Sequence, residues 1–213
     1  MQRLRLKFSR GEELKFLSHL DLMRLWERAF RRAGIPLAYS EGFTPHPQIA
    51  LAAPLLVGVT SDAELMDVSL SRWISPQSFI AQIEKQLPCG IKLIEARPVG
   101  SNVPSLQSQV KFVEYIVEVE ADKGRQEVES DLESFLSKKE LPWHHNRDTG
   151  ARYYDLRALV ESLQLTEYRD SVCVLSMRLR SDEKGAGRPE QVTKALGFTK
   201  RPKSIHRTNL ILG

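Results

Sequence analysis

The chain has 213 residues, of which 41% are hydrophobic and 27% are charged, values that are typical of a globular protein. This length suffices for one large domain or for two of about 100 residues each. The longest apolar run, around 49–59, contains Pro54 and Gly58 and is too short to span a bilayer. Charged residues interrupt 1–15, which argues against a signal peptide, so we expect a cytoplasmic protein without a membrane partner.

Charge is distributed unevenly along the chain. Residues 1–35 carry nine Lys or Arg against four Asp or Glu, and residues 180–213 carry eight against three, so each end has a net charge of +5. Because the whole chain is +4, residues 36–179 must be −6. This distribution indicates an oriented electric field rather than a uniformly basic surface.

The cysteines and histidines do not predict a metal site. Cys89 and Cys173 have no cysteine neighbours, so we expect two buried thiols rather than a zinc ribbon, an iron–sulfur cluster or a disulfide. His144 and His145 are adjacent, with Asp148 nearby, and neighbours in regular structure cannot both point at one ion. We therefore expect neither metal nor cofactor.

The first half of the chain predicts six elements. Charged and apolar residues alternate over 3–8, which is typical of a strand. A helix is predicted to follow Ser18 as its N-cap and to end at Gly34. Further strands are predicted at 49–52, 65–70 and 91–96, with a helix from Pro76 to Leu87 between the last two.

The second half repeats a similar order after a Ser-, Asn-, Pro- and Gln-rich linker at 100–108. Strands are predicted at 112–120, 153–156, 172–179 and 205–212, and helices at 125–139 and 187–196. Over 157–165 the periodicity leaves open a continued strand or a helical turn. The pattern predicts an α+β fold of two tandem ferredoxin-like (βαββαβ) units with antiparallel sheets, at 1–100 and 109–213.

Arginines form a stripe on the first predicted helix. The spacing i, i+4, i+7, i+8 places four of them on one face: Arg24, Arg28, Arg31 and Arg32. Guanidinium groups in a row suit a nucleic-acid backbone. The alternative is a solvated helix face, partly neutralised by a pair between Glu27 and Arg31. A second candidate anion contact is the segment Lys200, Arg201 and Lys203.

The loop at 42–48 has an unusual composition. Pro45 and Pro47 flank His46 and restrain the backbone that presents its imidazole. Hydroxyl and amide groups nearby come from Tyr39, Thr44 and Gln48. We expect this loop to contact a phosphate, a base edge or a carboxylate, and the alternative is a rigid turn with a surface histidine.

A complete catalytic set is not evident. His19 lies in the first turn of the predicted helix, where Asp21 is two residues away and does not face it. The candidate acid or base groups are therefore only His46, His19 and Tyr39. We expect a protein that is not an enzyme.

Three segments, 16–24, 31–36 and 39–47, resemble a bacterial domain family of unknown function that is linked to radical SAM proteins by gene fusion or gene proximity. The chain lacks the three-cysteine motif of a radical SAM enzyme, so the resemblance implies a companion of such a protein. Its members are often encoded near ribosomal-protein or ribonuclease genes, which implies a connection to RNA. The expected architecture is also similar to that of CRISPR repeat-processing endoribonucleases, which use histidine or tyrosine without metal.

These inferences together predict an RNA-binding or adaptor protein. It would present structured RNA to a radical SAM partner, in RNA or ribosome-related metabolism. One alternative is a metal-independent endoribonuclease that uses His46 or His19. The other is a protein–protein interaction module that does not bind RNA.

Overall fold

The structure, a computed structural model, describes residues 1–100, 102–147 and 150–213. The chain divides into two compact units, Met1–Val110 together with Gly213, and Lys111–Leu212. Both units combine helices with antiparallel strand pairs, so the expected α+β class is confirmed. The expectation that 1–100 and 109–213 are separate domains stays a prediction.

The first unit follows the expected order of strands and helices closely. Its elements are β1 (Gln2–Arg10), the 3-10 helix η1 (Glu12–Leu14), α1 (His19–Arg32), β2 (Ile49–Leu51), β3 (Thr60–Leu70), α2 (Pro76–Ile83), the 3-10 helix η2 (Glu84–Gln86), β4 (Ile91–Val99) and the short α3 (Leu106–Gln109). The third strand, β3, begins at Thr60, five residues before its predicted start at residue 65. The sequence pattern misses these five residues because apolar alternation is weak in them.

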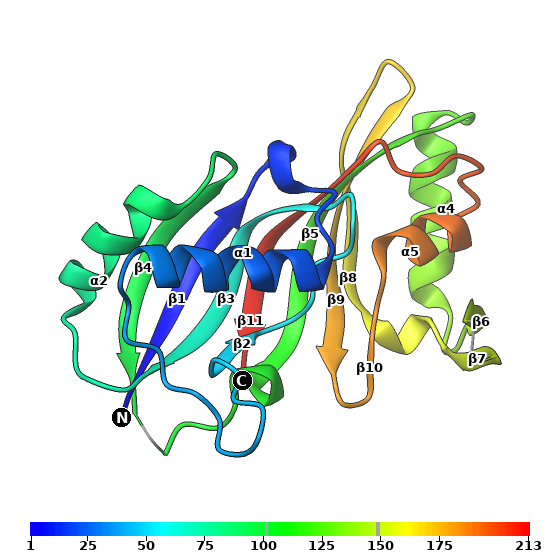
Figure 1. Cartoon of the computed structure of the whole chain (residues 1–213). Helices are drawn as coiled ribbons and strands as arrows, with labels where there is room; N and C mark the ends of the chain where they lie inside the picture. The colour runs from blue at the N-terminus through cyan, green and yellow to red at the C-terminus, as the bar shows by residue number, and fades with distance from the viewer. Residues whose placement is uncertain (101, 148–149) are drawn as a thin grey trace. The chain divides into compact units, whose positions relative to one another are not determined.

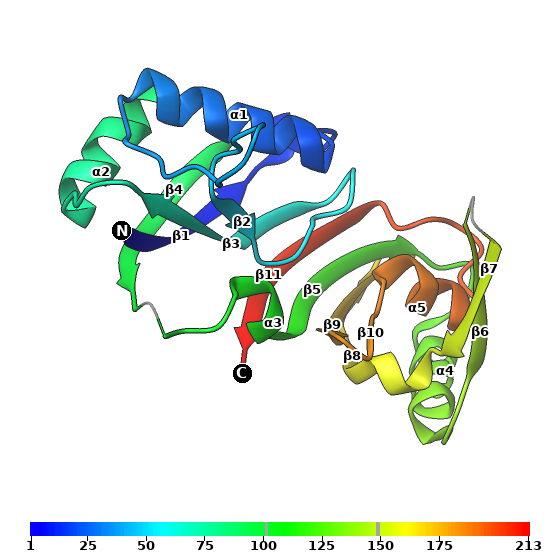
Figure 2. The same ribbon diagram turned by 60° about the horizontal axis from the view of Figure 1, so that its bottom comes forward.

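The sheet of the first unit has the strand order β2-β3-β1-β4, and each neighbouring pair is antiparallel. In the central strand, Leu4 lies opposite Val68 of β3 and Pro98 of β4. Both α1 and α2 cover one face of this sheet (Figures 1 and 2). Because side chains alternate along a strand, one face of β1 supplies the core beneath these helices.

That core contains a chain of aromatic rings. Phe8 of β1 contacts Trp26 of α1 with ring centroids 4.9 Å apart, and Trp26 stacks on Phe30 at 5.4 Å. Phe30 in turn reaches Phe79 of α2 at 5.9 Å. All four rings are fully buried, so they fix the position of α1 over the sheet.

The ends of α1 are where the sequence predicts them. The Ser18 side chain accepts a hydrogen bond from the backbone N–H of Asp21 at 3.2 Å, which caps the first turn. At the other end Gly34 has a φ of +66°, a conformation that side chains with a Cβ rarely adopt. The Ile35 N–H then bonds to the Phe30 carbonyl at 3.0 Å, and the helix stops.

A buried arginine holds the connection that leads into α1. The side chain of Arg10, at the end of β1, is only 1% exposed. Its Nε donates to the Leu14 carbonyl at 3.0 Å, and its Nη2 donates to the carbonyls of Lys15 and Leu17 at 2.7 and 3.0 Å. The guanidinium thus holds three carbonyls of this turn together, in addition to the backbone N–H groups of Leu17 and Gly58 that bond to the Leu14 and Lys15 carbonyls, a role that charge patterning did not predict.

The face of the first sheet opposite α1 contains a buried ion pair. Arg5 donates from Nε and Nη2 to the two carboxylate oxygens of Asp67, at 2.8 and 3.0 Å. A third contact runs from Arg5 Nη1 to Gln109 Oε1 at 3.2 Å. Arg3 donates to the carbonyls of Gly100 and Val103. Described parts of the predicted 100–108 linker are therefore tied to this sheet.

The second unit has more elements than the sequence predicts. They are β5 (Val110–Glu120), α4 (Arg125–Ser137), β6 (Pro142–Arg147), β7 (Gly150–Asp155), the 3-10 helix η3 (Arg157–Leu159), β8 (Val160–Arg169), β9 (Val172–Asp182), β10 (Gly185–Ala186), α5 (Pro189–Ala195) and β11 (Ser204–Leu212). In its sheet β9 pairs with β5, β8 and β10, and β5 neighbours β11.

An uninterrupted βαββαβ order is wrong for this half. The strand predicted at 153–156 falls mostly within β7, which pairs with β6 in a separate two-stranded sheet. Over 157–165 the sequence left open a helical turn or a continued strand. The structure contains both, because the 3-10 helix η3 is followed directly by the strand β8. The β6–β7 hairpin was missed because Pro142–Arg147 is polar and lacks the apolar alternation of a core strand.

Two further sequence expectations can be compared with the structure. Cys173 is buried as expected, but Cys89 is exposed, because it lies in the turn between η2 and β4 rather than in a core element. None of the helices that the structure describes has both the length and the apolar character needed to cross a membrane.

Candidate nucleic-acid interface

The amphipathic pattern of α1 separates a buried stripe from a basic one. Four positions of the helix pack into the core: Leu22, Trp26, Ala29 and Phe30. The four arginines predicted to share a face are all exposed: Arg24, Arg28, Arg31 and Arg32. Burial of the apolar stripe therefore fixes the direction in which the basic stripe faces the solvent.

Most of this positive charge is not neutralised by neighbouring carboxylates. Arg24 lies 3.6 Å from Asp21, and both side chains are at least half exposed, so the pair is weak. Arg28 Nε donates to the Arg24 carbonyl at 3.1 Å. The pair between Glu27 and Arg31, which the alternative of a solvated helix face predicts, does not form. Within the described part of the chain only Arg24 of the four arginines has an ion-pair partner.

The loop after α1 is closed by backbone pairing. Tyr39 and Pro47 form an isolated antiparallel bridge, and the Ser40 N–H donates to the His46 carbonyl at 2.9 Å. The Ser40 hydroxyl accepts from the His46 N–H at 3.0 Å, and the Gln48 side chain donates to the Tyr39 carbonyl at 3.3 Å. These bonds hold the two ends of the loop together, so they restrain the backbone on which its tip is carried.

The tip of this loop projects an aromatic ring into the solvent. Phe43 has a relative exposure of 109%, the highest among the exposed large apolar side chains of the described chain. It follows Gly42, whose φ of +120° permits a turn that few other residues allow. Thr44 and His46 are also exposed. Sequence reasoning missed Phe43, although an apolar residue between turn-forming neighbours was a usable signal.

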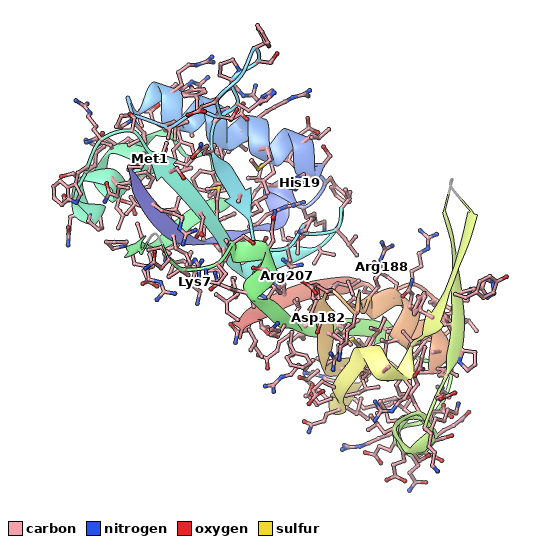
Figure 3. All side chains as sticks on the ribbon, turned by 90° about the horizontal axis from the view of Figure 1, so that it is seen from below. Met1, Lys7, His19, Asp182, Arg188 and Arg207 are labelled. Atoms are coloured by element: carbon pink, nitrogen blue, oxygen red, sulfur yellow. The ribbon has the colours of Figure 1, made fainter. Side chains whose placement is uncertain are left out.

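The three candidate acid or base groups are not assembled into one set. Tyr39 and His46 belong to the same closed loop, and both are exposed. His19 lies at the N-terminal end of α1 (Figure 3). Among the described residues, no hydrogen bond joins the side chain of His19 to either of the other two. The geometry thus offers surface groups for contact rather than a paired acid and base.

A groove borders the basic stripe at the C-terminal half of α1. It has a volume of about 330 Å³ and lies between this helix and the η2 segment. Its lining residues are Leu25, Arg28, Ala29, Arg32, Lys85, Gln86, Leu87 and Pro88. Lys85 therefore adds a third cation to two of the predicted arginines. Its role depends on how η2 packs against α1, which the sequence pattern did not reveal.

The C-terminal basic segment belongs to the second unit and is partly neutralised there. Lys200 and Lys203 both contact the Glu120 carboxylate, at 2.5 and 2.7 Å. Hydrogen bonds and charge from these two lysines lower the pKa of Glu120 to about 2, so the carboxylate stays ionised at neutral pH. Arg201 between them is exposed. This segment therefore offers less free positive charge than its composition suggests.

The structure supplies no candidate metal centre in the residues it describes. His144 lies with its ring 6.0 Å from that of Tyr153, an aromatic contact across the β6–β7 hairpin. Asp148, which the sequence places near these histidines, lies outside the described residues.

Solved structures share the fold of this chain at low sequence identity. A chain in the crystal structure of a Cbf5–Nop10–Gar1 complex matches with a TM-score of 0.55 and 8% identity, over 97% of this chain and 48% of that chain. A chain in the structure of an H/ACA RNP bound to a substrate RNA containing 2'-deoxyuridine matches with a TM-score of 0.50 and 10% identity, over 97% and 46%. This chain thus spans about half the length of the solved chains that it resembles.

Sequence comparison identifies a family. No curated protein matches the chain. A family profile described as "Uncharacterized protein conserved in bacteria (DUF2344)" matches residues 3–189, which is most of the sequence. That description agrees with the resemblance to a bacterial family of unknown function and contains no link to radical SAM proteins. The chain therefore belongs to the DUF2344 family of uncharacterized bacterial proteins.

Proposed function

We propose that this protein binds RNA through the exposed basic face of α1. The main support for the proposal is that carboxylates do not neutralise the positive charge of that face. Arg28, Arg31 and Arg32 are exposed and, in the described residues, none of them pairs with a carboxylate. A row of uncompensated guanidinium groups on a rigid helix can track the phosphates of a nucleic-acid backbone, with affinity driven by counterion release.

The comparisons supply independent support for RNA as the polyanion. One chain with a similar fold belongs to an RNP that is bound to a substrate RNA.

We propose further that both units are ferredoxin-like. The strand order β2-β3-β1-β4 in the first unit supports this, as does the order β8-β9-β5-β11 in the second unit, with β6, β7 and β10 as additions. Fold likeness alone does not define an activity, so the α1 surface remains the main support.

The loop at 42–48 would supply contacts beyond the phosphates. Thr44, His46 and Gln48 carry hydroxyl, imidazole and amide groups that can reach base edges or the 2′-hydroxyl. Phe43 is a free aromatic ring on which an unpaired base can stack. Phosphate contacts position a protein on RNA, whereas contacts to bases confer selectivity. The arginines of α1 would therefore determine affinity, and the loop would determine which RNA is preferred.

Phe43→Ala is expected to weaken RNA binding by roughly 5- to 150-fold, because stacking of a base on an aromatic side chain contributes about 1–3 kcal/mol. The thermal unfolding temperature should not change, since the ring makes no buried contact. Phe16→Ala is the matched control, because Phe16 is also an exposed phenylalanine at 73%. Equal losses for the two variants would contradict a specific role for the loop.

Several parts of the sequence interpretation stay predictions. They are the cytoplasmic location, a radical SAM partner, and RNA contacts by Lys200, Arg201 and Lys203. The endoribonuclease alternative, with His46 or His19 as acid or base, also stays untested.

A mobility-shift assay with structured RNA in EDTA tests the proposed function. We expect a retarded complex and intact RNA. Cleavage that disappears in His46→Ala or His19→Ala would favour the endoribonuclease. An unchanged RNA mobility, together with a tight complex between this protein and another protein, would favour the interaction module and overturn RNA binding.

A further inference from the structure

The groove between α1 and η2 combines three cations with an apolar floor. Arg28 and Arg32 lie one helical turn apart on α1, and Lys85 comes from the facing η2 segment. No acidic side chain is among the residues that line the groove. Within the described residues, none of the three cations forms an ion pair. Such an arrangement favours a compact anion with several oxygen atoms, because it can accept hydrogen bonds from all three groups.

The helix dipole does not account for this cluster. Arginines in the last turn of a helix are stabilised by its negative end, which gives Arg31 and Arg32 a structural reason to be there. Arg28 lies a turn earlier, however, and Lys85 belongs to another element. Like charges that line one groove without a carboxylate repel one another, so an anion bound there would relieve this repulsion.

The rest of the lining indicates that the anion carries an apolar group. Leu25, Ala29, Leu87 and Pro88 provide a hydrocarbon surface beside the cations. The volume of about 330 Å³ lies at the small end of the range of roughly 300–1,000 Å³ that small-molecule sites span. A free phosphate ion would leave this apolar surface uncovered, whereas the sugar and base of a nucleotide can cover it.

We propose that this groove is a nucleotide subsite, in which Arg28, Arg32 and Lys85 bind one phosphate while the attached sugar and base lie against Leu87 and Pro88. The proposal rests on the proposed RNA-binding function and adds to it a defined position for one nucleotide. The phosphate could come from an RNA chain or from a free nucleoside monophosphate. The chemistry that the groove recognises is the same in both cases.

The exposed Cys89 offers a direct reporter for this groove. It follows Pro88 in the chain, and a fluorophore on its thiol would lie beside the lining residues. Cys173 should not react, because it is buried and burial raises the pKa of its thiol. Labelled protein can be titrated with a short single-stranded RNA, with AMP and with inorganic phosphate. We expect a saturable signal with RNA and with AMP, and a weaker one with phosphate.

Lys85→Gln is the decisive variant, because it removes one cation of the groove and leaves α1 intact. We expect it to weaken the binding of both RNA and AMP by roughly tenfold, the cost of losing one hydrogen bond to a charged group. Lys92→Gln is the matched control, an exposed lysine on β4 that does not line the groove, and it should change neither.

The outcomes separate the subsite from the proposed function. RNA binding that survives Lys85→Gln unchanged would overturn the subsite and leave RNA binding by α1 intact. AMP binding that depends on Lys85, without any RNA binding, would overturn the proposed function and support a nucleotide site. A signal of equal strength with inorganic phosphate would contradict the role of the apolar floor.

Discussion

The double replacement Arg28→Glu with Arg32→Glu is expected to reduce RNA affinity by more than roughly 100-fold, because each guanidinium lost removes a charge-assisted hydrogen bond of about 1.5–3 kcal/mol. The new carboxylates would also repel the phosphates and thereby increase the loss. Both side chains are exposed, so the free energy of unfolding should fall by only about 1 kcal/mol, mainly because Arg32→Glu places a negative charge in the last turn of α1. Filter binding at constant ionic strength measures the affinity, and circular dichroism confirms that the helix is retained.

The control must change net charge equally without touching α1. Lys92→Glu with Arg97→Glu meets this condition, because both residues are exposed on β4 of the same unit. They lie opposite Ser9 and Arg5 of β1, on the face of the sheet that α1 does not cover. We expect this variant to lose much less affinity than the α1 variant. Similar losses would mean that net charge, rather than the α1 surface, determines binding.

Asp67→Ala is expected to destabilise the protein by about 3–5 kcal/mol, the cost of leaving one member of a buried ion pair without its partner. The side chains of Arg5 and Asp67 are only 4% and 7% exposed, and the two hydrogen bonds between them are 2.8 and 3.0 Å long. Urea denaturation of the mutant and the wild type gives this difference directly.

Two variants distinguish a buried pair from ion pairs in general. Glu114→Ala removes the partner of Arg178 in a pair that is 44% and 29% exposed, and it should cost about 0–1 kcal/mol. Arg5→Met combined with Asp67→Leu replaces both charges with apolar groups and should recover part of the lost stability. The recovery is partial because Arg3 Nε, 3.9 Å from the Asp67 carboxylate, loses its contact in both variants. A loss for Asp67→Ala as small as that for Glu114→Ala would contradict the importance of the buried pair.

Local chemistry explains why the sequence predicted α1 correctly. The Ser18 side chain caps the helix by accepting a hydrogen bond from Asp21, three residues later in the chain. Gly34 ends the helix because glycine readily adopts a positive φ. Both signals therefore depend only on neighbouring residues. The apolar stripe of α1 repeats with the period of a helix, so the opposite, arginine-bearing face could be assigned before the structure was known. The strands of the first unit were identified for the same reason, because alternation is a property of consecutive residues.

Features that depend on tertiary packing could not be predicted in this way. Lys85 lines the groove because η2 packs beside α1, and the buried role of Arg10 depends on three carbonyl groups that a turn brings together. The pairing of Lys200 and Lys203 with Glu120 likewise joins segments that are far apart in the sequence. A basic residue looks the same in a linear pattern whether it contacts solvent, a carbonyl or a carboxylate.

The most direct test of RNA binding by α1 is the salt dependence of the association constant of the wild-type protein. If the four arginines of α1 contact phosphates, the logarithm of this constant should fall against the logarithm of salt concentration with a slope of roughly −3, since each contact with single-stranded RNA contributes about −0.7. The Arg28→Glu, Arg32→Glu variant should show a slope of about half this size. Binding that does not depend on salt, or a slope that this variant leaves unchanged, would contradict RNA recognition by the basic face of α1.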